Sequence, residues 1–203
     1  DRTAPLRGPL AQAGGVLALG TFPDAQVDYY LRKLSKAGRY RLSRREIREL
    51  LRKLAPYKVR DLLTDYLGPL WSADYGAIWR SARQSTSGDW HHDNVGNRVK
   101  LFVVLGNESD ENGTEFIPHT NRTRWRSFSG RLPAPDSGGE FVRQQRGDIL
   151  LFDTNVVHRG RYSAHERVIL QIEFSNIFKS FVVFGQCGRF FRARFERSYG
   201  ATE

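Results

Sequence analysis

The chain has 203 residues, which is long enough for one domain with a substantial core and short for two. Its hydrophobic fraction of 39%, with 13 Phe, 8 Tyr and 4 Trp, is typical of a folded globular protein and excludes a disordered one. A single cysteine, Cys187, excludes an intrachain disulfide, and no apolar run is long enough to span a membrane. We therefore expect a cytoplasmic protein without a transmembrane segment.

The formal net charge of +10 is concentrated in one segment. Residues 31–60 contain twelve Lys or Arg and two Glu, so this stretch holds the whole excess and the rest of the chain is neutral. Two interpretations stand: a solvated helical face, or a charged cover that recruits a phosphorylated, sulfated or carboxylated small molecule. Evenly spread basic charge would favour nucleic acid as the partner, and this distribution does not.

The N-terminal third has the pattern of one strand followed by helices. Ser43 and Glu46 have the spacing of a capping box, and Pro56 interrupts the apolar face that follows. Gly68 and Pro69 form a strong stop signal. The patterns predict a strand over 13–20 and helices over 25–38, from residue 43 to Pro56, and over 59–67.

The remainder of the chain consists of short apolar runs separated by Gly, Asn, Asp and Pro. These runs are rich in β-branched and aromatic residues, which favour strands. Helices first and many short strands afterwards indicate a mainly β sandwich or barrel with flanking α-helices. The predicted strands cover residues 77–83, 98–105, 114–117, 140–144, 148–152, 168–174 and 181–184.

A metal-binding pattern occurs near the middle of the chain, at His91-His92-Asp93. Residues two apart in an extended chain point the same way, so His91 and Asp93 can reach one centre while His92 projects to the opposite side. One imidazole and one carboxylate supply two thirds of the facial triad of non-haem Fe(II) oxygenases. H-x-D alone is common, and a polar surface loop is the alternative interpretation.

A third ligand would have to come from a distant strand. His158 follows the apolar run and turn of residues 147–157, where the end of a sheet would place it at a pocket mouth. His165 lies in a polar loop, and His119 follows Pro118 at a turn, where it could face a substrate or support the ligands. We therefore predict that His158 is the third ligand.

Two basic residues lie in predicted strands, where a charge is costly to bury. Arg167 opens the strand over 168–174, and there it could clamp a dicarboxylate with charge-assisted hydrogen bonds. Lys100 lies within the strand over 98–105, and it is either a similar anion-binding group or a charge on an edge strand.

Taken together, these pieces resemble the phytanoyl-CoA dioxygenase family, in order and spacing, over roughly residues 13–175. The resemblance implies a double-stranded β-helix, that is, a jelly-roll or cupin-like core. It also implies Fe(II), O2 and 2-oxoglutarate, with decarboxylation of 2-oxoglutarate to succinate and oxidation of a substrate C–H bond. The matching stretches are Trp90-His91-His92-Asp93, residues 100–105, residues 111–118, residues 147–152, His158 and Arg167.

Carried across to this sequence, the resemblance assigns iron to His91, Asp93 and His158. It gives the far carboxylate of 2-oxoglutarate to Arg167, with Lys100 and Thr114 as further candidates for that pocket. The family usually continues with Gly-Ser-His after the proline, whereas this chain has Pro118-His119-Thr120-Asn121. The basic segment 31–60 has no counterpart in the family that we can place.

We expect one oxygenase domain over residues 1–203. It would comprise an N-terminal strand and helical cover (13–75), a jelly-roll core (76–185) and a C-terminal tail (186–203). The tail pairs Arg with aromatic residues, which fits a packed final helix or, as a minor alternative, a peripheral membrane contact.

Three functional classes are compatible with these features. The first is an oxygenase that acts on a small, anionic or carrier-linked molecule by hydroxylation or another C–H oxidation. The second is the same chemistry directed at nucleic acid, and the third is a non-redox, metal-binding cupin-like protein. Arg167 discriminates against the third, because a non-redox site has no need to clamp a dicarboxylate. The first class is the one we predict.

Overall fold

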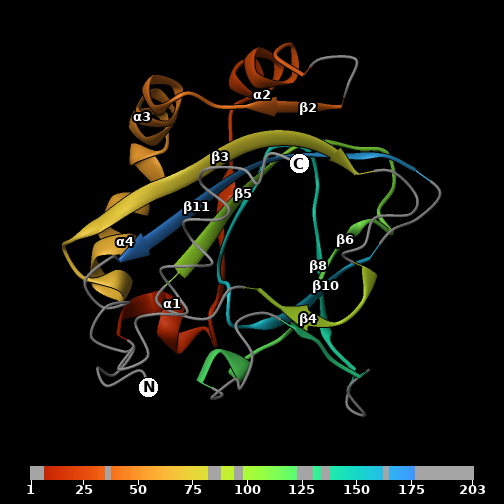
Figure 1. The fold of residues 1–203 in the computed structure, drawn as a ribbon. Coiled ribbons are helices and arrows are strands. Elements are labelled where there is room, and N and C mark those ends of the chain that lie inside the picture. The colour runs from red at the N-terminus through yellow and green to blue at the C-terminus, as the bar shows by residue number, and fades with distance from the viewer. Residues whose placement is uncertain are drawn as a thin grey trace, which may run out of the picture.

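The computed structural model describes residues 7–34, 38–81, 88–93, 98–122, 130–133, 138–161 and 165–176. These residues form two antiparallel β-sheets that face each other, with helices packed outside the larger sheet (Figure 1). No helix among the described residues is both long and apolar enough to cross a membrane.

The helices precede most of the strands. The α-helices are α1 Gly8–Gln12, α2 Asp24–Leu31, α3 Arg44–Lys53 and α4 Val59–Leu67, with 3-10 turns at Ala55–Tyr57 and Thr120–Arg122. The strands are β1 Val16–Thr21, β2 Arg39–Arg41, β3 Trp71–Ser81, β4 His91–His92, β5 Arg98–Asn107, β6 Gly113–Ile117, β7 Gly130–Arg131, β8 Glu140–Arg143, β9 Asp148–Asp153, β10 Val157–Arg161 and β11 Arg167–Asn176.

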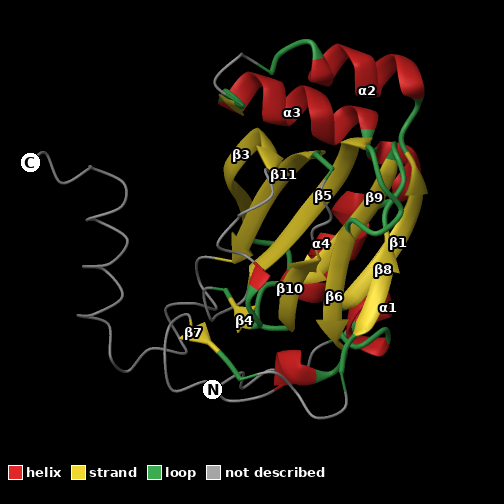
Figure 2. Ribbon diagram, turned by 90° about the vertical axis from the view of Figure 1, so that its right-hand side faces the viewer, coloured by secondary structure: helices red, strands yellow, loops and turns green. Residues whose placement is uncertain are grey.

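The two sheets are built by a chain that alternates between them. The larger sheet has the order β1-β9-β5-β11-β3-β2, and the smaller has the order β7-β4-β10-β6-β8. From β3 onward, β3, β5, β9 and β11 enter the larger sheet, while β4, the consecutive strands β6, β7 and β8, and β10 enter the smaller one (Figure 2). This alternation defines a double-stranded β-helix, the jelly-roll core that the sequence resemblance implies.

Alternating side chains of the larger sheet fill two separate apolar layers. On β5, Leu101 and Val103 face the helices and belong to the main core cluster. Phe102 points the other way and packs with Phe116 and Phe152 between the two sheets. A central strand with both faces buried has a near-continuous apolar run, and this explains why β5 and β9 are well predicted from sequence.

The helices close the outer face of the larger sheet. The predicted capping box of α3 is present, because the Ser43 hydroxyl accepts from the Glu46 backbone N–H while the Glu46 carboxylate accepts from the Ser43 backbone. Leu50 of α3 and Leu63 of α4 are fully buried in the same cluster as the outer face of β5. The prediction of α4 over 59–67 is confirmed to the residue.

Three features of the predicted arrangement differ from the structure. The second helix ends at Leu31 instead of Gly38, because the chain must turn back to place β2 against β3. Strand β3 begins at Trp71, earlier than the predicted start at residue 77 and earlier than the expected core boundary at residue 76. The short elements α1, β2, β4, β7 and β10 are not predicted at all.

The predicted strand over 181–184, the C-terminal tail over 186–203 and Cys187 lie outside the described residues.

Candidate metal centre

Three of the predicted side chains meet at one point of the smaller sheet. The ligand atoms of His91, Asp93 and His158 all lie within 4.8 Å of one another, a spacing that could hold a metal ion. His91 lies on β4 and is the register partner of His158 on β10, while Asp93 directly follows β4. Antiparallel pairing therefore positions the two imidazoles, and their ring centroids lie 4.4 Å apart.

Backbone contacts orient both imidazoles in the same way. Nδ1 of His91 lies 2.6 Å from the Asp89 carbonyl oxygen, and Nδ1 of His158 lies 2.8 Å from that of Val156. A carbonyl oxygen can only accept, so each Nδ1 carries a proton, and in the neutral imidazole each Nε2 then keeps its lone pair. The Nε2 atoms of His91 and His158 face the Asp93 carboxylate, at 3.9 Å and 3.2 Å. Histidine ligands of metals are typically held in this manner.

Asp93 is held by one backbone contact and one side-chain contact. Its backbone N–H donates to the Thr154 carbonyl at 2.9 Å, and Lys100 Nζ lies 2.6 Å from its Oδ2. Burial alone would raise the pKa of Asp93, but the charges of Lys100 and His158 outweigh it and hold that pKa well below its ordinary value. Asp93 therefore offers an anionic oxygen at neutral pH.

The protonation state of His91 also suits coordination. Burial lowers the pKa of His91 below its usual value, and the neighbouring His158 lowers it further. A neutral imidazole is the form that binds metals. The group offers two imidazole nitrogens and one carboxylate oxygen, and this donor set is that of a facial triad.

An apolar layer lies directly under this group. The ring of Phe152 packs edge-on against the His158 ring at 5.2 Å, and the ring of Phe116 stacks on it at 6.0 Å. Both phenylalanines are buried in the cluster between the two sheets. The polar group therefore has a water-free floor, which strengthens electrostatic interactions above it.

A second polar cluster lies at the start of β11. Arg167 is only 2% exposed, and its Nη1 donates to Gln144 Oε1 at 2.6 Å and to Thr114 Oγ1 at 3.4 Å. The structure thus brings together two of the residues predicted for the co-substrate pocket, Arg167 and Thr114. Gln144, which follows β8, is a member that the sequence reasoning missed.

Strand register connects this cluster with the metal-binding group, that is, the candidate ligands His91, Asp93 and His158. Thr114 is the register partner of Gly160, and Phe116 is the register partner of His158. Thr114 and His158 therefore belong to the same face of the smaller sheet, displaced by two residues along the strand. Two residues of strand correspond to roughly 7 Å.

Lys100, the third residue predicted for that pocket, contacts Asp93 directly. Its ammonium is engaged by Asp93 at 2.6 Å and by Glu173 at 3.5 Å. Burial opposes the charge, but the two carboxylates outweigh it and raise the pKa of Lys100 above its ordinary value. Lys100 therefore contacts the metal-binding group itself, and Glu173 is a second residue that sequence reasoning missed.

A signal for Glu173 was present in the sequence. Glu173 falls within the predicted strand 168–174, where a buried charge calls for a partner, and the register pairs it with Lys100 on β5. Gln144 gave no such signal, since an amide at the end of a strand is an ordinary surface residue.

The other histidines do not join the three ligand candidates. His92 is buried, as its opposite orientation implies, and its Nδ1 lies 2.9 Å from the Asp93 carbonyl oxygen. His119 is exposed at a turn with a positive φ of 67°, where its backbone N–H donates to the Gly14 carbonyl. His165 is exposed as well.

Comparison with models of protein families gives no match, and no curated protein matches the chain. Solved structures with the same fold do exist. One is EvdMO1, which is 20% identical with a TM-score of 0.59. That alignment covers 81% of this chain and 48% of EvdMO1, so the chain spans about half the length of EvdMO1.

Two further structures match over more of their own length. HygX from Streptomyces hygroscopicus, solved with iron bound, is 15% identical with a TM-score of 0.60, over 83% of this chain and 85% of HygX. SnoN is named a non-haem α-ketoglutarate-dependent epimerase from nogalamycin biosynthesis. Its complex with Fe3+, α-ketoglutarate and nogalamycin RO is 14% identical with a TM-score of 0.58, over 82% of this chain and 80% of SnoN. At these identities the likeness establishes the double-stranded β-helix fold.

Proposed function

We propose that this protein is a non-haem Fe(II)- and 2-oxoglutarate-dependent dioxygenase that oxidises a C–H bond of a small molecule. The observation that carries the proposal is the convergence of His91, Asp93 and His158 within 4.8 Å on a jelly-roll scaffold. Iron in HygX and Fe3+ with α-ketoglutarate in SnoN support it, since both proteins share this fold.

The donor set fits Fe(II) for three reasons. Two imidazole nitrogens and one carboxylate oxygen leave three coordination positions for a chelating co-substrate and dioxygen. Both Nε2 atoms are directed inward by hydrogen bonds at Nδ1. Asp93 is held anionic, which supplies one of the charges that a dication needs. His91, Asp93 and His158 would therefore hold the metal.

Arg167 would hold the far carboxylate of 2-oxoglutarate. The guanidinium is buried and reaches neutral oxygens of Gln144 and Thr114. A carboxylate is a stronger acceptor for arginine than an amide or a hydroxyl oxygen. Thr114, which Arg167 contacts, is offset by two residues from His158, roughly 7 Å along the sheet, and a span of this order suits a five-carbon dicarboxylate.

The roles of the residues follow from these contacts. When bound, iron with 2-oxoglutarate and O2 supplies the oxidising power, with succinate and CO2 as the co-products. The protein binds the co-substrate through Arg167, and it orients the imidazoles through the carbonyls of Asp89 and Val156. The aromatic floor of Phe116 and Phe152 excludes water from one side of the site.

Within this class, we propose hydroxylation as the outcome and retain the resemblance to the phytanoyl-CoA dioxygenase family as its support. SnoN carries the name of an epimerase, so an unchanged product mass is the alternative outcome for the same site. Mass spectrometry of a converted substrate separates the two, because hydroxylation adds one oxygen atom and epimerisation adds none.

The experiment that tests the proposal is an anaerobic titration of the full chain with Fe(II) and then 2-oxoglutarate. We expect the weak visible charge-transfer band of a chelated 2-oxoglutarate–iron complex. Folded, metal-loaded protein without this band would refute the assignment and would favour a non-redox metal-binding protein.

Variants separate the two halves of the site. His91→Ala, Asp93→Ala and His158→Ala should each lose most of the iron bound by the parent chain. Arg167→Met should retain iron but bind 2-oxoglutarate about 10- to 100-fold more weakly, since it removes charge-assisted hydrogen bonds. Arg161→Met is the matched control, because Arg161 is half exposed and pairs with Glu115. Equal co-substrate affinity in Arg167→Met and the parent would contradict the role of Arg167.

A further inference from the structure

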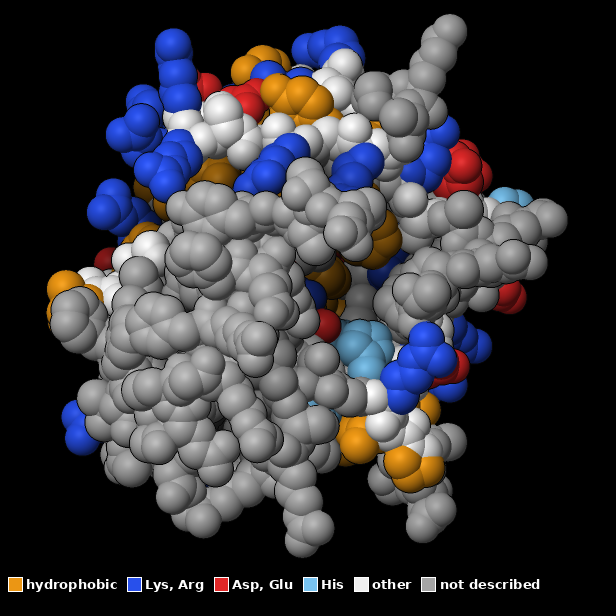
Figure 3. Space-filling view, in the orientation of Figure 1, with side chains coloured by type: hydrophobic (Ala, Val, Ile, Leu, Met, Phe, Trp, Pro, Cys, Tyr) orange, Lys and Arg blue, Asp and Glu red, His pale blue; other side chains and the backbone are white. Residues whose placement is uncertain are grey.

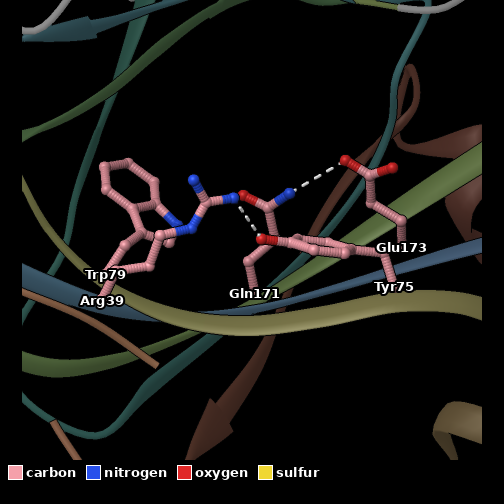
Figure 4. A pocket seen from close by; sticks show the side chains of 5 residues that line it. All are labelled: Arg39, Tyr75, Trp79, Gln171 and Glu173. Atoms are coloured by element: carbon pink, nitrogen blue, oxygen red, sulfur yellow. Dashed lines mark hydrogen bonds between the residues drawn. The ribbon is translucent and has the colours of Figure 1, made fainter. Parts of the chain in front are cut away.

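A cavity opens beside the metal centre, on the inner face of the larger sheet. Its volume is about 390 Å³, and it is lined by Arg39, Tyr75, Trp79, Gln171 and Glu173 (Figure 4). Tyr75 and Trp79 come from β3, Gln171 and Glu173 from β11, and Arg39 from the outermost strand β2. None of these five residues was singled out as a site residue from the sequence.

One row of paired residues connects the cavity with the metal-binding group. Glu173 is the register partner of Lys100 on one side and of Tyr75 on the other. Its carboxylate contacts Lys100 at 3.5 Å, and Lys100 contacts Asp93 at 2.6 Å. Two side-chain contacts, Glu173 to Lys100 and Lys100 to Asp93, therefore join the inner end of the cavity to a proposed metal ligand. A substrate would have to reach that ligand's side of the cavity.

The two ends of the cavity differ in charge. At the inner end, the Glu173 carboxylate accepts from the Gln171 amide at 2.9 Å and pairs with Lys100, an ammonium that it shares with Asp93. At the outer end, Arg39 donates to the Tyr75 hydroxyl at 2.7 Å, and Figure 4 shows its guanidinium extended across the cavity. Arg41, also on β2, lies over the Tyr75 ring at 5.7 Å. Two guanidinium groups, those of Arg39 and Arg41, therefore lie at the outer end.

The surroundings reinforce this polarity. Lys and Arg side chains gather over the part of the surface that holds α2 and α3, as Figure 3 shows. Arg39 lies within residues 31–60, the segment that holds the whole positive excess of the chain. Clustered charge of one sign raises the local concentration of oppositely charged ligands.

We propose that this cavity is the substrate pocket, and that it takes an elongated small molecule with an anionic group, a carboxylate or a phosphate, bound by Arg39. This inference rests on the proposed function. The apolar part of the molecule packs against Trp79 and Tyr75, and the carbon to be oxidised lies at the opposite end, toward Lys100 and Asp93. β2 and β5, which carry Arg39 and Lys100, lie three strand spacings apart, roughly 14 Å between backbones, and this separation favours an elongated molecule.

The test is isothermal titration of the full chain, loaded anaerobically with Fe(II) and 2-oxoglutarate, with three matched probes: 4-phenylbutyrate, 4-phenylbutyl phosphate and neutral 4-phenylbutanol. We expect at least one anion to bind about tenfold more tightly than the alcohol. The anion that binds more tightly identifies the group as carboxylate or phosphate. Equal affinity for all three probes, or binding of none, overturns the proposal.

Two variants locate the effect. Arg39→Gln should bring the affinity of the anions down to that of the alcohol. Arg48→Gln removes the same charge from an exposed position of α3, outside the cavity, and should leave the preference for anions intact. An equal loss in both variants would mean attraction by the basic segment as a whole, and would overturn the assignment to Arg39.

The same titrations in metal-free protein keep the two proposals apart. None of the five lining residues is a proposed metal ligand, so the probes should show the same order of affinity without iron. If the charge-transfer band is absent while the Arg39-dependent preference for anions remains, the proposed function fails and the pocket stands. If the band appears and the preference for anions is absent, the proposed function stands and the assignment of the pocket fails.

Discussion

Replacement of Lys100 by methionine tests the charge balance of the metal centre. In the metal-free chain the Lys100 ammonium is the counter-charge of both Asp93 and Glu173, and its side chain is only 13% exposed. Lys100→Met keeps the side chain up to the position of Cε, removes the ammonium, and leaves two largely buried carboxylates without that partner. Breaking a buried ion pair by removing one member typically costs 3–5 kcal/mol, so we expect a loss of about 3 kcal/mol of unfolding free energy.

The loss of stability should be smaller when a divalent metal is bound. The ammonium lies 2.6 Å from a carboxylate oxygen of Asp93, so a dication held by Asp93 would lie about 5 Å from it. Even with the dielectric constant of water, a unit charge and a dication at about 5 Å repel by roughly 1.7 kcal/mol. Lys100→Met should therefore bind the metal about tenfold more tightly than the parent.

Thermal denaturation with and without Zn2+ measures both effects at once. For a chain of this size about 3 kcal/mol corresponds to a fall in Tm of roughly 6–12 °C in the metal-free state. The rise in Tm on adding Zn2+ should be larger in Lys100→Met than in the parent. Arg48→Met, which removes an exposed charge from α3, should change neither value. A smaller metal-induced rise in Lys100→Met would refute the reasoning, and would mean that Lys100 supports metal binding by orienting Asp93.

Two further predictions concern stability. Burial would raise the pKa of Glu46, but Lys33 and Ser43 outweigh it and lower the pKa to about 2, below the ordinary value of 4.5. The resulting stabilisation is present above pH 4.5 and is lost as the pH falls toward 2. In urea denaturation Glu46→Gln should therefore cost about 2 kcal/mol at pH 7 and much less near pH 2; a cost independent of pH would speak against this. Phe152→Ala should lower the unfolding free energy by about 3–5 kcal/mol, because Phe152 is fully buried between the sheets, and a loss below about 1 kcal/mol would show that the layer collapses around the cavity.

The parts of the fold that sequence reasoning predicts are those with an apolar periodicity. β5 and β9 are buried on both faces, and α3 carries a complete capping box, so local patterns determine them. β4 and β10 escape prediction for a physical reason, since their sequences are His-His and Val-His-Arg-Gly-Arg. Strands that carry polar site residues inward lose the alternation on which strand prediction depends.

The site, too, has residues that local sequence predicts and contacts that it does not. The two-residue spacing of His91 and Asp93 placed both on one side, and the position of His158 after an apolar run marked a sheet end. The sequence indicates that the buried charges of Lys100 and Glu173 need partners, but not that they pair with each other, because the two residues lie on separate strands. Contacts across a sheet depend on register, which a single sequence specifies only weakly where inward residues are polar.

Strand β2 has a consequence for how this protein could diversify. It is the outermost strand of the larger sheet and is joined to it by three register pairs, all with β3. Edge segments with few partners unfold locally at lower free energy than central strands, and they tolerate exchange better. His91 and His158, in contrast, are paired between neighbouring strands of the smaller sheet. Substitutions in β2 could therefore change or remove the selectivity for an anion at Arg39 while the proposed oxidising centre is retained.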